Sequence, residues 1–173
     1  MEFQDVVQTR RSIRAFSADP VEPAKLQAIL KAMNQAPSAG NLQAYEVYQV
    51  TYPALRASVA QAAFMQMFIA DAPVILIFCA NPARSADRYA ERGITLYSVQ
   101  DATIACTIAA LAATDQGLGT VWVGAFDPEA VRKAASIPEN LLPVAILPIG
   151  HPAENPSKRA RRSLKDLVHL VQD

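Results

Sequence analysis

The sequence predicts an α+β fold in a single domain that spans residues 1–173. Its helices and strands are expected to follow one another irregularly, without the repeated strand–helix–strand units of a doubly wound fold. Two continuous apolar runs, 73–79 and 142–150, have the pattern of strands that are covered on both faces. With 51% hydrophobic side chains and no low-complexity linker, 173 residues can form one well-buried core.

Hydrophobic spacing and turn residues assign the first half of the chain. In residues 23–35, apolar side chains recur at helical spacing, and Pro23 stands early in the helix, where its missing N–H costs little. Residues 45–50 alternate between polar and apolar side chains, as strands do. The run 73–79 is expected to lie in the middle of the sheet. The expected elements are helices over residues 2–9, 23–35 and 53–69, a polar loop over 36–43, and strands over 45–50 and 73–79.

The second half begins with one or two helices between residues 86 and 116. Within them, residues 102–113 have almost no polar face, which predicts a helix buried on all sides. A monomer of this size rarely provides such burial, so we expect a homodimer. The remaining expected elements are a strand over residues 120–126, a helix over 128–135, a strand over 142–150, and a segment over 164–171 that could be a strand.

Composition excludes several classes of protein. A formal net charge of zero argues against a nucleic-acid coat protein, which carries excess positive charge over a whole face. The N-terminus lacks a basic segment followed by an apolar run, and no apolar stretch reaches the roughly 18 residues of a membrane span. Cys79 and Cys106 have apolar neighbours and no CxxC spacing, which predicts buried free thiols. We expect a cytoplasmic protein that binds neither nucleic acid nor membrane.

Two short basic clusters, residues 10–14 and 158–162, hold seven of the sixteen lysines and arginines. Residues two apart in an extended segment point the same way, so Arg10, Ser12 and Arg14 can converge on one point, as can Arg159 and Arg161. Arginine donates two parallel hydrogen bonds to phosphate oxygens. The clusters predict a phosphate site that folding brings together. The alternatives are a solvated helix end for the first cluster and a nucleic-acid or targeting tail for the second.

Two further segments can approach a ligand. The loop with Ser38, Asn41 and Gln43 offers neutral polar side chains suited to the edge of a planar heterocycle, although such residues also form ordinary turns. Gly124 follows an apolar strand, so it can expose a backbone N–H to a ligand or simply form a bulge. The glycines at 117–124 follow a helix and enter a strand, the reverse of a dinucleotide-binding motif.

No pattern supports metal or hydrolytic catalysis. His151 and His169 lack metal spacing with each other or with carboxylates, neither cysteine has an obvious histidine partner, and the sequence contains no GxSxG.

Five segments in order resemble the nitroreductase family, and together they cover nearly the whole chain. They are Arg-Arg-Ser-Ile-Arg-Ala-Phe at 10–16, Ala-Pro-Ser-Ala-Gly-Asn-Leu-Gln at 36–43, Gln-Asp at 100–101, Gly-Leu-Gly-Thr-Val-Trp-Val-Gly-Ala-Phe at 117–126, and Gly-His-Pro at 150–152 with Arg159 and Arg161. The resemblance implies a central mixed or antiparallel β-sheet flanked by helices, in an intertwined homodimer with FMN at the subunit interface.

The resemblance also implies a role for individual residues. The backbone N–H of Gly124 would face flavin N5, and Val123 would lie beside the ring. The loop residues would line the flavin from the partner subunit. The full set of cofactor-binding residues that we expect is Arg10, Arg11, Ser12, Arg14, Pro37, Ser38, Asn41, Gln43, Val123, Gly124, Arg159 and Arg161.

The implied activity is a ping-pong transfer of two electrons from NAD(P)H, through FMN, to a nitroaromatic, quinone or similar small-molecule acceptor. Because the cofactor carries the chemistry, no catalytic acid or base and no metal need appear. The alternatives are a flavin enzyme of the same fold with different chemistry, such as dehalogenation, flavin fragmentation or dehydrogenation, a non-catalytic flavin-binding protein, and a nucleic-acid-binding module.

Some features depart from the family pattern. Gln43 is followed by Ala44 and Tyr45, where the family loop often has Pro-Trp. Arginines at 84, 88 and 92 stand at helical spacing, and they could bind the phosphates of NAD(P)H or solvate a helix face. Lys158 and Arg162 have no clear role in the family.

Overall fold

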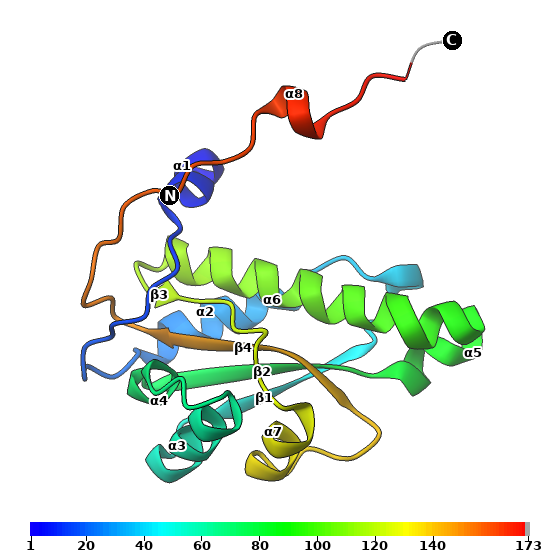
Figure 1. Cartoon of the computed structure of the whole chain (residues 1–173), viewed down its shortest axis with the longest axis horizontal. Coiled ribbons are helices and arrows are strands. Elements are labelled where there is room, and N and C mark those ends of the chain that lie inside the picture. Colours follow the sequence, from blue (N-terminus) through cyan, green and yellow to red (C-terminus); the bar gives the residue numbers. More distant parts are fainter. Residues whose placement is uncertain (172–173) are drawn as a thin grey trace.

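A four-stranded antiparallel sheet forms the centre of the computed structural model, which describes residues 1–171 (Figure 1). The last two residues of the single predicted domain therefore lie outside the described part. The strand order β1-β2-β4-β3 places β2 in the interior, as predicted. The strands are β1 (Tyr45–Val50), β2 (Val74–Ala80), β3 (Gly119–Thr120) and β4 (Leu142–Gly150).

Helices cover both faces of this sheet (Figure 1). Alternate residues of β2 belong to two separate core clusters: Leu76 and Phe78 pack in the one with α2 and α6, and Ile75 and Ile77 in the one with α3, α4 and α7. Because both faces are covered, the strand can be apolar throughout. The helices are α1 (Phe3–Thr9), α2 (Pro23–Met33), α3 (Pro53–Ala62), α4 (Phe68–Asp71), α5 (Pro82–Arg92), α6 (Ser98–Asp115), α7 (Pro128–Ala134) and α8 (Leu164–Leu167), with the 3₁₀ turn η1 (Ala39–Asn41) and the π-helical turn η2 (Gly93–Tyr97).

Two expected elements are interrupted or shortened in the structure. The helix expected over 53–69 is interrupted, because Phe64 and Met65 have left-handed φ angles of 55° and 62°. The strand expected over 120–126 ends at Thr120, and only Val123 forms a further bridge, to Ile146 of β4. In that register Val121 lies opposite Pro148, which has no N–H to donate, so the ladder is broken there.

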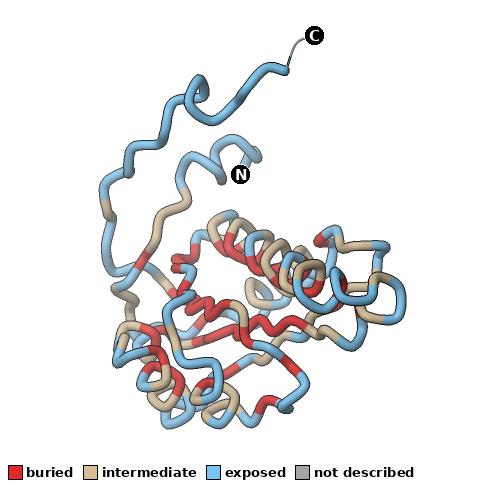
Figure 2. The backbone as a smooth tube through the Cα atoms, turned by 45° about the vertical axis from the view of Figure 1, so that its right-hand side comes forward, coloured by how far each residue is buried: buried red, intermediate tan, exposed pale blue. Residues whose placement is uncertain are grey.

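The C-terminal strand expected over 164–171 is wrong. Residues 164–167 form the short helix α8 instead, and the Ser163 hydroxyl caps it by accepting a hydrogen bond from the Asp166 N–H at 3.3 Å. This segment projects away from the sheet and has no strand beside it with which to pair (Figures 1 and 2).

Within one protomer helix α6 is buried along one face, and its burial on all sides in a homodimer stays a prediction. Its buried residues include Ala105, Cys106 and Ala109, which pack on the sheet, while Ile108 and Leu111 on the remaining surface are only half-buried (Figure 2). The helical segment Pro82–Asp115 contains an 18-residue stretch that is apolar enough, by length and composition, to cross a membrane, so the expectation that no apolar stretch reaches that length is wrong. A core helix of a globular domain has the same properties, and α6 packs as one.

Candidate functional site

Backbone pairing brings the two basic clusters together. Residues 15–17 lie beside the chain that leaves β4: Ser17 N–H donates to the His151 carbonyl at 2.9 Å, and Ala153 N–H donates to the Ala15 carbonyl at 2.8 Å. The next residues of each segment are the basic ones. The N-terminal and C-terminal cations therefore meet although about 145 positions separate them, which the order along the sequence alone does not require.

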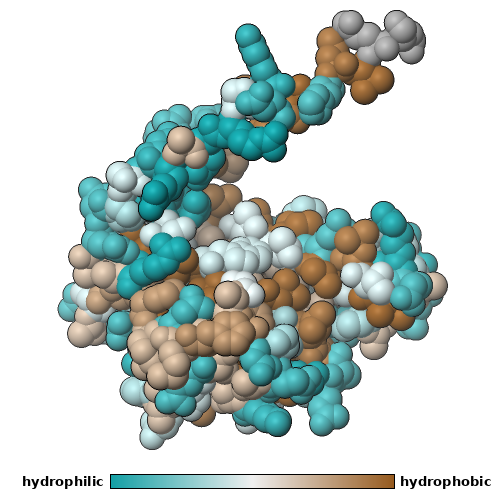
Figure 3. Space-filling view, viewed as in Figure 1, coloured by the Kyte–Doolittle hydropathy of each residue, from teal (hydrophilic) through white to brown (hydrophobic). Residues whose placement is uncertain are grey.

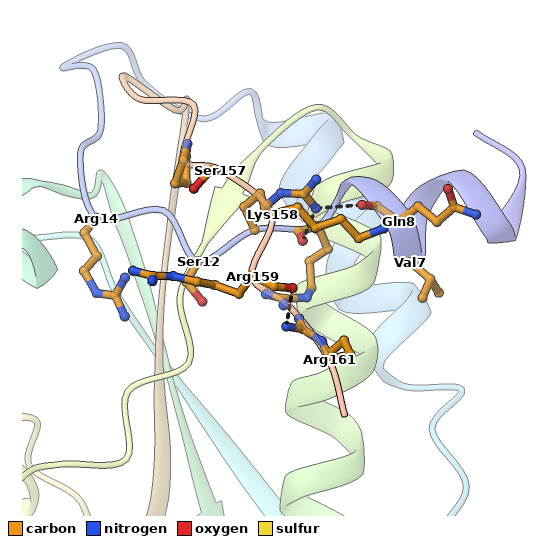
Figure 4. Close-up of a pocket in the computed structure, with 11 residues that line it drawn as sticks. Val7, Gln8, Ser12, Arg14, Ser157, Lys158, Arg159 and Arg161 are labelled. Carbon is orange, nitrogen blue, oxygen red and sulfur yellow. Dashed lines mark hydrogen bonds between the residues drawn. The ribbon is translucent and has the colours of Figure 1, made fainter. Parts of the chain in front are cut away.

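A pocket of about 400 Å³ lies between the two clusters (Figure 4). In Figure 4 the side chains of Arg14 and Arg159 point toward one another across Ser12. Six of the lining residues are cations and none is acidic, and within residues 1–171 none of these six side chains forms an ion pair. The lining residues are Val7, Gln8, Arg10, Arg11, Ser12, Arg14, Pro156, Ser157, Lys158, Arg159 and Arg161.

Arg10 is the central cation of the pocket. Its side chain is half-buried, and burial, followed by the positive charges of Arg161 and Arg11, lowers the pKa of its guanidinium. Like charges that approach one another without an acidic partner repel, and a bound anion removes that repulsion. The pocket therefore has the electrostatics of an anion site.

The segment that carries Arg10, Ser12 and Arg14 is fixed against β3. Ile13 is buried, its N–H donates to the Thr120 carbonyl at 3.0 Å, and Ser12 forms a parallel bridge with Thr120. A Cβ on Gly119 would lie 2.9 Å from Ile13 Cγ1, so only glycine lets the two segments approach this closely. With Ile13 turned into the core, its extended neighbours face the opposite side, as the alternation predicts.

Two of the predicted arginines have local partners. Arg11 donates from Nη1 to the carbonyls of Gln8 at 2.6 Å and of Thr9 and Arg10 at 3.0 Å, so it satisfies the last carbonyls of α1 while it lines the pocket wall. Arg161 donates to the Arg159 carbonyl at 3.1 Å. Arg11 is thus less free than Arg14 or Arg159 to bind a ligand.

A second cavity, of about 330 Å³, continues from the first and shares Arg10 and Ser12 with it. Its other walls are mainly apolar and come from α6, from the last residue of β3 and from the segment that follows β3: Thr107, Ala110, Leu111, Thr120 and Trp122. A ligand that has an anionic end and a larger, less polar body fits this arrangement. Thr120, Trp122 and Lys158 were not among the predicted site residues, although residues 120, 122 and 124 share the two-residue spacing that could have identified them.

Val123 and Gly124 lie just beyond that cavity. The Val123 side chain is buried in the core, so it cannot face a ligand. Its backbone exchanges two hydrogen bonds of 2.9 Å with Ile146, which fixes the position of this segment. Gly124 is exposed, and among residues 1–171 its N–H has no acceptor. A Cβ there would contact only the Trp122 indole, at 3.7 Å from Nε1. The free N–H and the open space leave room for the contact that the resemblance implies, which stays a prediction.

The polar loop lies at the other end of α6. The carboxylate of Asp101, in the first turn of α6 and 1% exposed, accepts from Ala39 N–H at 2.9 Å and from Ala44 N–H at 3.1 Å. Arg10 lines a cavity with Thr107, Ala110 and Leu111 of the same helix, which lie about 9–15 Å further along its axis at 1.5 Å per residue. Neither cavity includes Pro37, Ser38, Asn41 or Gln43. One protomer therefore does not bring this part of the predicted site to the basic pocket.

The loop has a strained backbone that its neighbours hold in place. Gly40, Asn41 and Gln43 have left-handed φ angles of 56°, 58° and 50°, and such strain persists only where surrounding contacts fix it. Arg84 Nε donates to the Leu42 carbonyl at 2.6 Å, and Arg88 Nη1 donates to the Gly40 carbonyl at 3.3 Å. These arginines support the loop, a role that neither sequence interpretation of them included. Arg92 instead donates to the Tyr97 hydroxyl at 2.9 Å.

Comparisons with known proteins identify the family of this chain. The family model described as "Nitroreductase family" matches residues 7–73 and 65–151. The chain belongs to the nitroreductase family. Among its relatives, an FMN reductase [NAD(P)H] of Bacillus subtilis is 33% identical over 172 residues, which cover 92% of this chain and 69% of the relative. An oxygen-insensitive NADPH nitroreductase of Salmonella typhimurium is 31% identical over 169 residues, which cover 94% and 70%.

Solved structures show the same fold. The NADPH:FMN oxidoreductase from Vibrio harveyi, solved in complex with NAD⁺, superposes with a TM-score of 0.89 at 29% identity. The match covers 98% of this chain and 74% of that one. Membership in the nitroreductase family and an α+β fold are thereby confirmed for this chain.

Proposed function

We propose that this protein is an NAD(P)H-dependent oxidoreductase that uses FMN to reduce nitroaromatics, quinones or similar small acceptors. The observation that carries the proposal is the acid-free cationic pocket, which continues into a mainly apolar cavity that ends near the free N–H of Gly124. Relatives named as FMN reductase and NADPH nitroreductase support the same activity.

The residues present fit FMN. Its phosphate would bind the unpaired cations, chiefly Arg10, Arg14, Arg159 and Arg161, with the hydroxyl of Ser12 as a further donor. The second cavity would hold the less polar remainder, with its wall of Ala110, Leu111 and Trp122. A planar guanidinium matches phosphate oxygens in pairs, which explains the use of arginine at most of these positions.

We further propose that the complete site needs two copies of the chain, each folded as a single domain. The loop residues Ser38, Asn41 and Gln43, with Pro37, would reach the flavin of the partner subunit, since within one protomer they lie at the far end of α6. The outward face of α6 carries half-buried apolar residues, and the C-terminal tail carries exposed ones such as Leu164 and Leu167 (Figure 3). A second copy that packs on these surfaces would bury them.

Bound FMN would supply the two-electron transfer between NAD(P)H and the acceptor. The contribution of the chain is to bind and orient it. The Gly124 N–H, which has no acceptor within residues 1–171, would be available to donate a hydrogen bond to the flavin ring, and the cations of the pocket would hold the phosphate. No side chain is required to act as an acid or a base.

We also propose that the protein works in the cytoplasm. Cys79 and Cys106 are free and buried, as predicted, and burial, followed by the charge of Glu46, raises the pKa of the Cys79 thiol to about 12. Protonated buried thiols suit a reducing compartment, in which they are not required to pair.

The test is the absorbance spectrum of the purified protein, followed by release of the cofactor by heat and its identification by chromatography. We expect an oxidised flavin spectrum, about one FMN per subunit, and oxidation of NADH or NADPH that depends on an added acceptor. A colourless protein that takes up no FMN contradicts the proposal. FMN without any NAD(P)H oxidation would instead indicate a flavin-binding protein or a different flavin chemistry.

A further inference from the structure

Glu154 stands beside the basic cluster without pairing with any of its cations. It lines a third cavity, of about 350 Å³, together with Arg10 and Arg11, yet within residues 1–171 its carboxylate makes no ion pair with either guanidinium. A carboxylate close to arginine normally forms the bidentate pair that its geometry favours. The lack of such an ion pair at Glu154 therefore requires an explanation.

The partners of Glu154 are backbone groups of the first cluster. One carboxylate oxygen, Oε1, accepts from the N–H of Arg14 and, at 3.1 Å, from the N–H of Ala15. Glu154 directly follows Ala153, whose own N–H donates to the Ala15 carbonyl at 2.8 Å. Glu154, at the start of the basic tail, therefore holds the backbone at the end of the basic N-terminal segment.

These hydrogen bonds help to fix the positions of two arginines. Arg14 carries its guanidinium on the peptide that Glu154 holds, and Arg159 follows only five residues after Glu154. Because residues 154–161 are exposed apart from a half-buried Pro156, few other contacts fix where the tail runs. The position of Arg159 over Ser12 in Figure 4 depends on where the tail begins.

We propose that Glu154 is a positioning residue of the phosphate pocket, which rests on the function proposed above. It joins the two cationic segments through backbone hydrogen bonds and leaves the guanidinium groups unpaired for the phosphate of FMN. A carboxylate that paired with Arg10 or Arg159 would instead compete with the phosphate. Its negative charge is incidental to this role, and its oxygen as an acceptor is essential.

The proposal separates hydrogen bonding from charge. In the variant Glu154→Ala both backbone hydrogen bonds are lost, and we expect FMN to bind up to about tenfold more weakly, the factor that corresponds to the net contribution of about one hydrogen bond. The variant Glu154→Gln keeps an acceptor oxygen at the same place and removes the charge, so its affinity should stay within about threefold of the wild type, a difference of less than 1 kcal/mol. Glu139→Ala removes one exposed carboxylate elsewhere and serves as the control.

The measurement is the affinity of the flavin-free protein for FMN and for riboflavin, which lacks the phosphate. We expect Glu154→Ala to reduce the preference for FMN over riboflavin about tenfold while riboflavin affinity and the thermal unfolding midpoint change little. Equal losses for both flavins would indicate a general structural role and overturn the proposal, as would unchanged FMN affinity. Tighter FMN binding in both Glu154→Ala and Glu154→Gln would show that only the charge matters, which also overturns it.

A different result identifies failure of the proposed function itself. If the wild-type protein binds FMN no better than riboflavin, the basic pocket is not a phosphate site, and the role of Glu154 fails with it. If the wild type prefers FMN to riboflavin and both Glu154 variants keep that preference unchanged, only the inference on Glu154 fails.

Discussion

The two ends of helix α6 present the two halves of the proposed site, and each half is held by one carboxylate. At the N-terminal end, Asp101 accepts from two backbone N–H groups of the polar loop and is 1% exposed. At the C-terminal end, Glu154 accepts from two N–H groups of the basic segment and is exposed. The hydrogen-bond pattern is the same, but the cost of losing it differs with burial.

The difference follows from access to water. When an exposed acceptor is removed, water can satisfy the N–H groups that it leaves, so the chain stays folded and only the placement of the cations changes. When a buried acceptor is removed, the N–H groups have no replacement. The loop end should therefore respond to mutation in stability, and the basic end in ligand binding.

The largest expected effect is on Asp101. Asp101→Ala leaves the N–H groups of Ala39 and Ala44 without a partner beside a strained loop, and it should lower the free energy of unfolding by about 3–5 kcal/mol. Asp101→Asn keeps one acceptor oxygen and should cost about half as much. Urea unfolding of the flavin-free protein measures both. A loss below about 1 kcal/mol in Asp101→Ala would contradict the role of burial.

The next effect concerns the cations and should appear in binding. Combining Arg10→Ala with Arg159→Ala removes a central and a facing cation of the pocket, and it should weaken FMN binding about 100-fold or more, because each charged hydrogen bond contributes about 1.5–3 kcal/mol. Arg162→Ala with Lys165→Ala removes two cations from the same tail that do not line the pocket, and it should change the affinity little. Isothermal titration or fluorescence quenching measures the affinity. Full FMN occupancy in the first double variant would refute the phosphate assignment.

The smallest expected signal tests whether the two ends meet across a dimer. A protein with the Arg10 and Arg159 changes and a second with Ser38→Ala, Asn41→Ala and Gln43→Ala each lack one half of every site. When the two are unfolded together and refolded, a mixed dimer regains one intact site of its two. FMN content should rise above that of either variant alone. If it does not rise, the loop and the pocket do not share a site across subunits.

Much of this architecture could be predicted from local sequence. Strands β1 and β4 have the expected bounds, and β2 lies mid-sheet because an apolar run without a polar face needs cover on both sides. The alternation in residues 10–14 predicts one shared side for Arg10, Ser12 and Arg14, and all three line the basic pocket, together with Arg11, which the alternation does not place there. The family was recognisable from motifs in order along the chain.

Other features depended on partners distant in the sequence. The ladder of β3 stops where Pro148 of β4 lacks an N–H. The expected helix over 53–69 is broken at two left-handed residues, neither of which is a glycine that would indicate the break in the sequence. The C-terminal strand was wrong because a strand needs a neighbour with which to pair, and the tail has none beside it.

The sequence by itself determined the fold class, the buried strands and which side chains carry positive charge, because hydrophobic spacing and residue chemistry are local properties. Only the tertiary structure decided that residues 15–17 pair with 151–153, which places the two basic clusters at one pocket. It also decided that the polar loop lies at the opposite end of α6, held by Asp101. The physical reason is that hydrogen bonds between distant segments form only after the core has brought them together, and the spacing of residues does not encode that meeting.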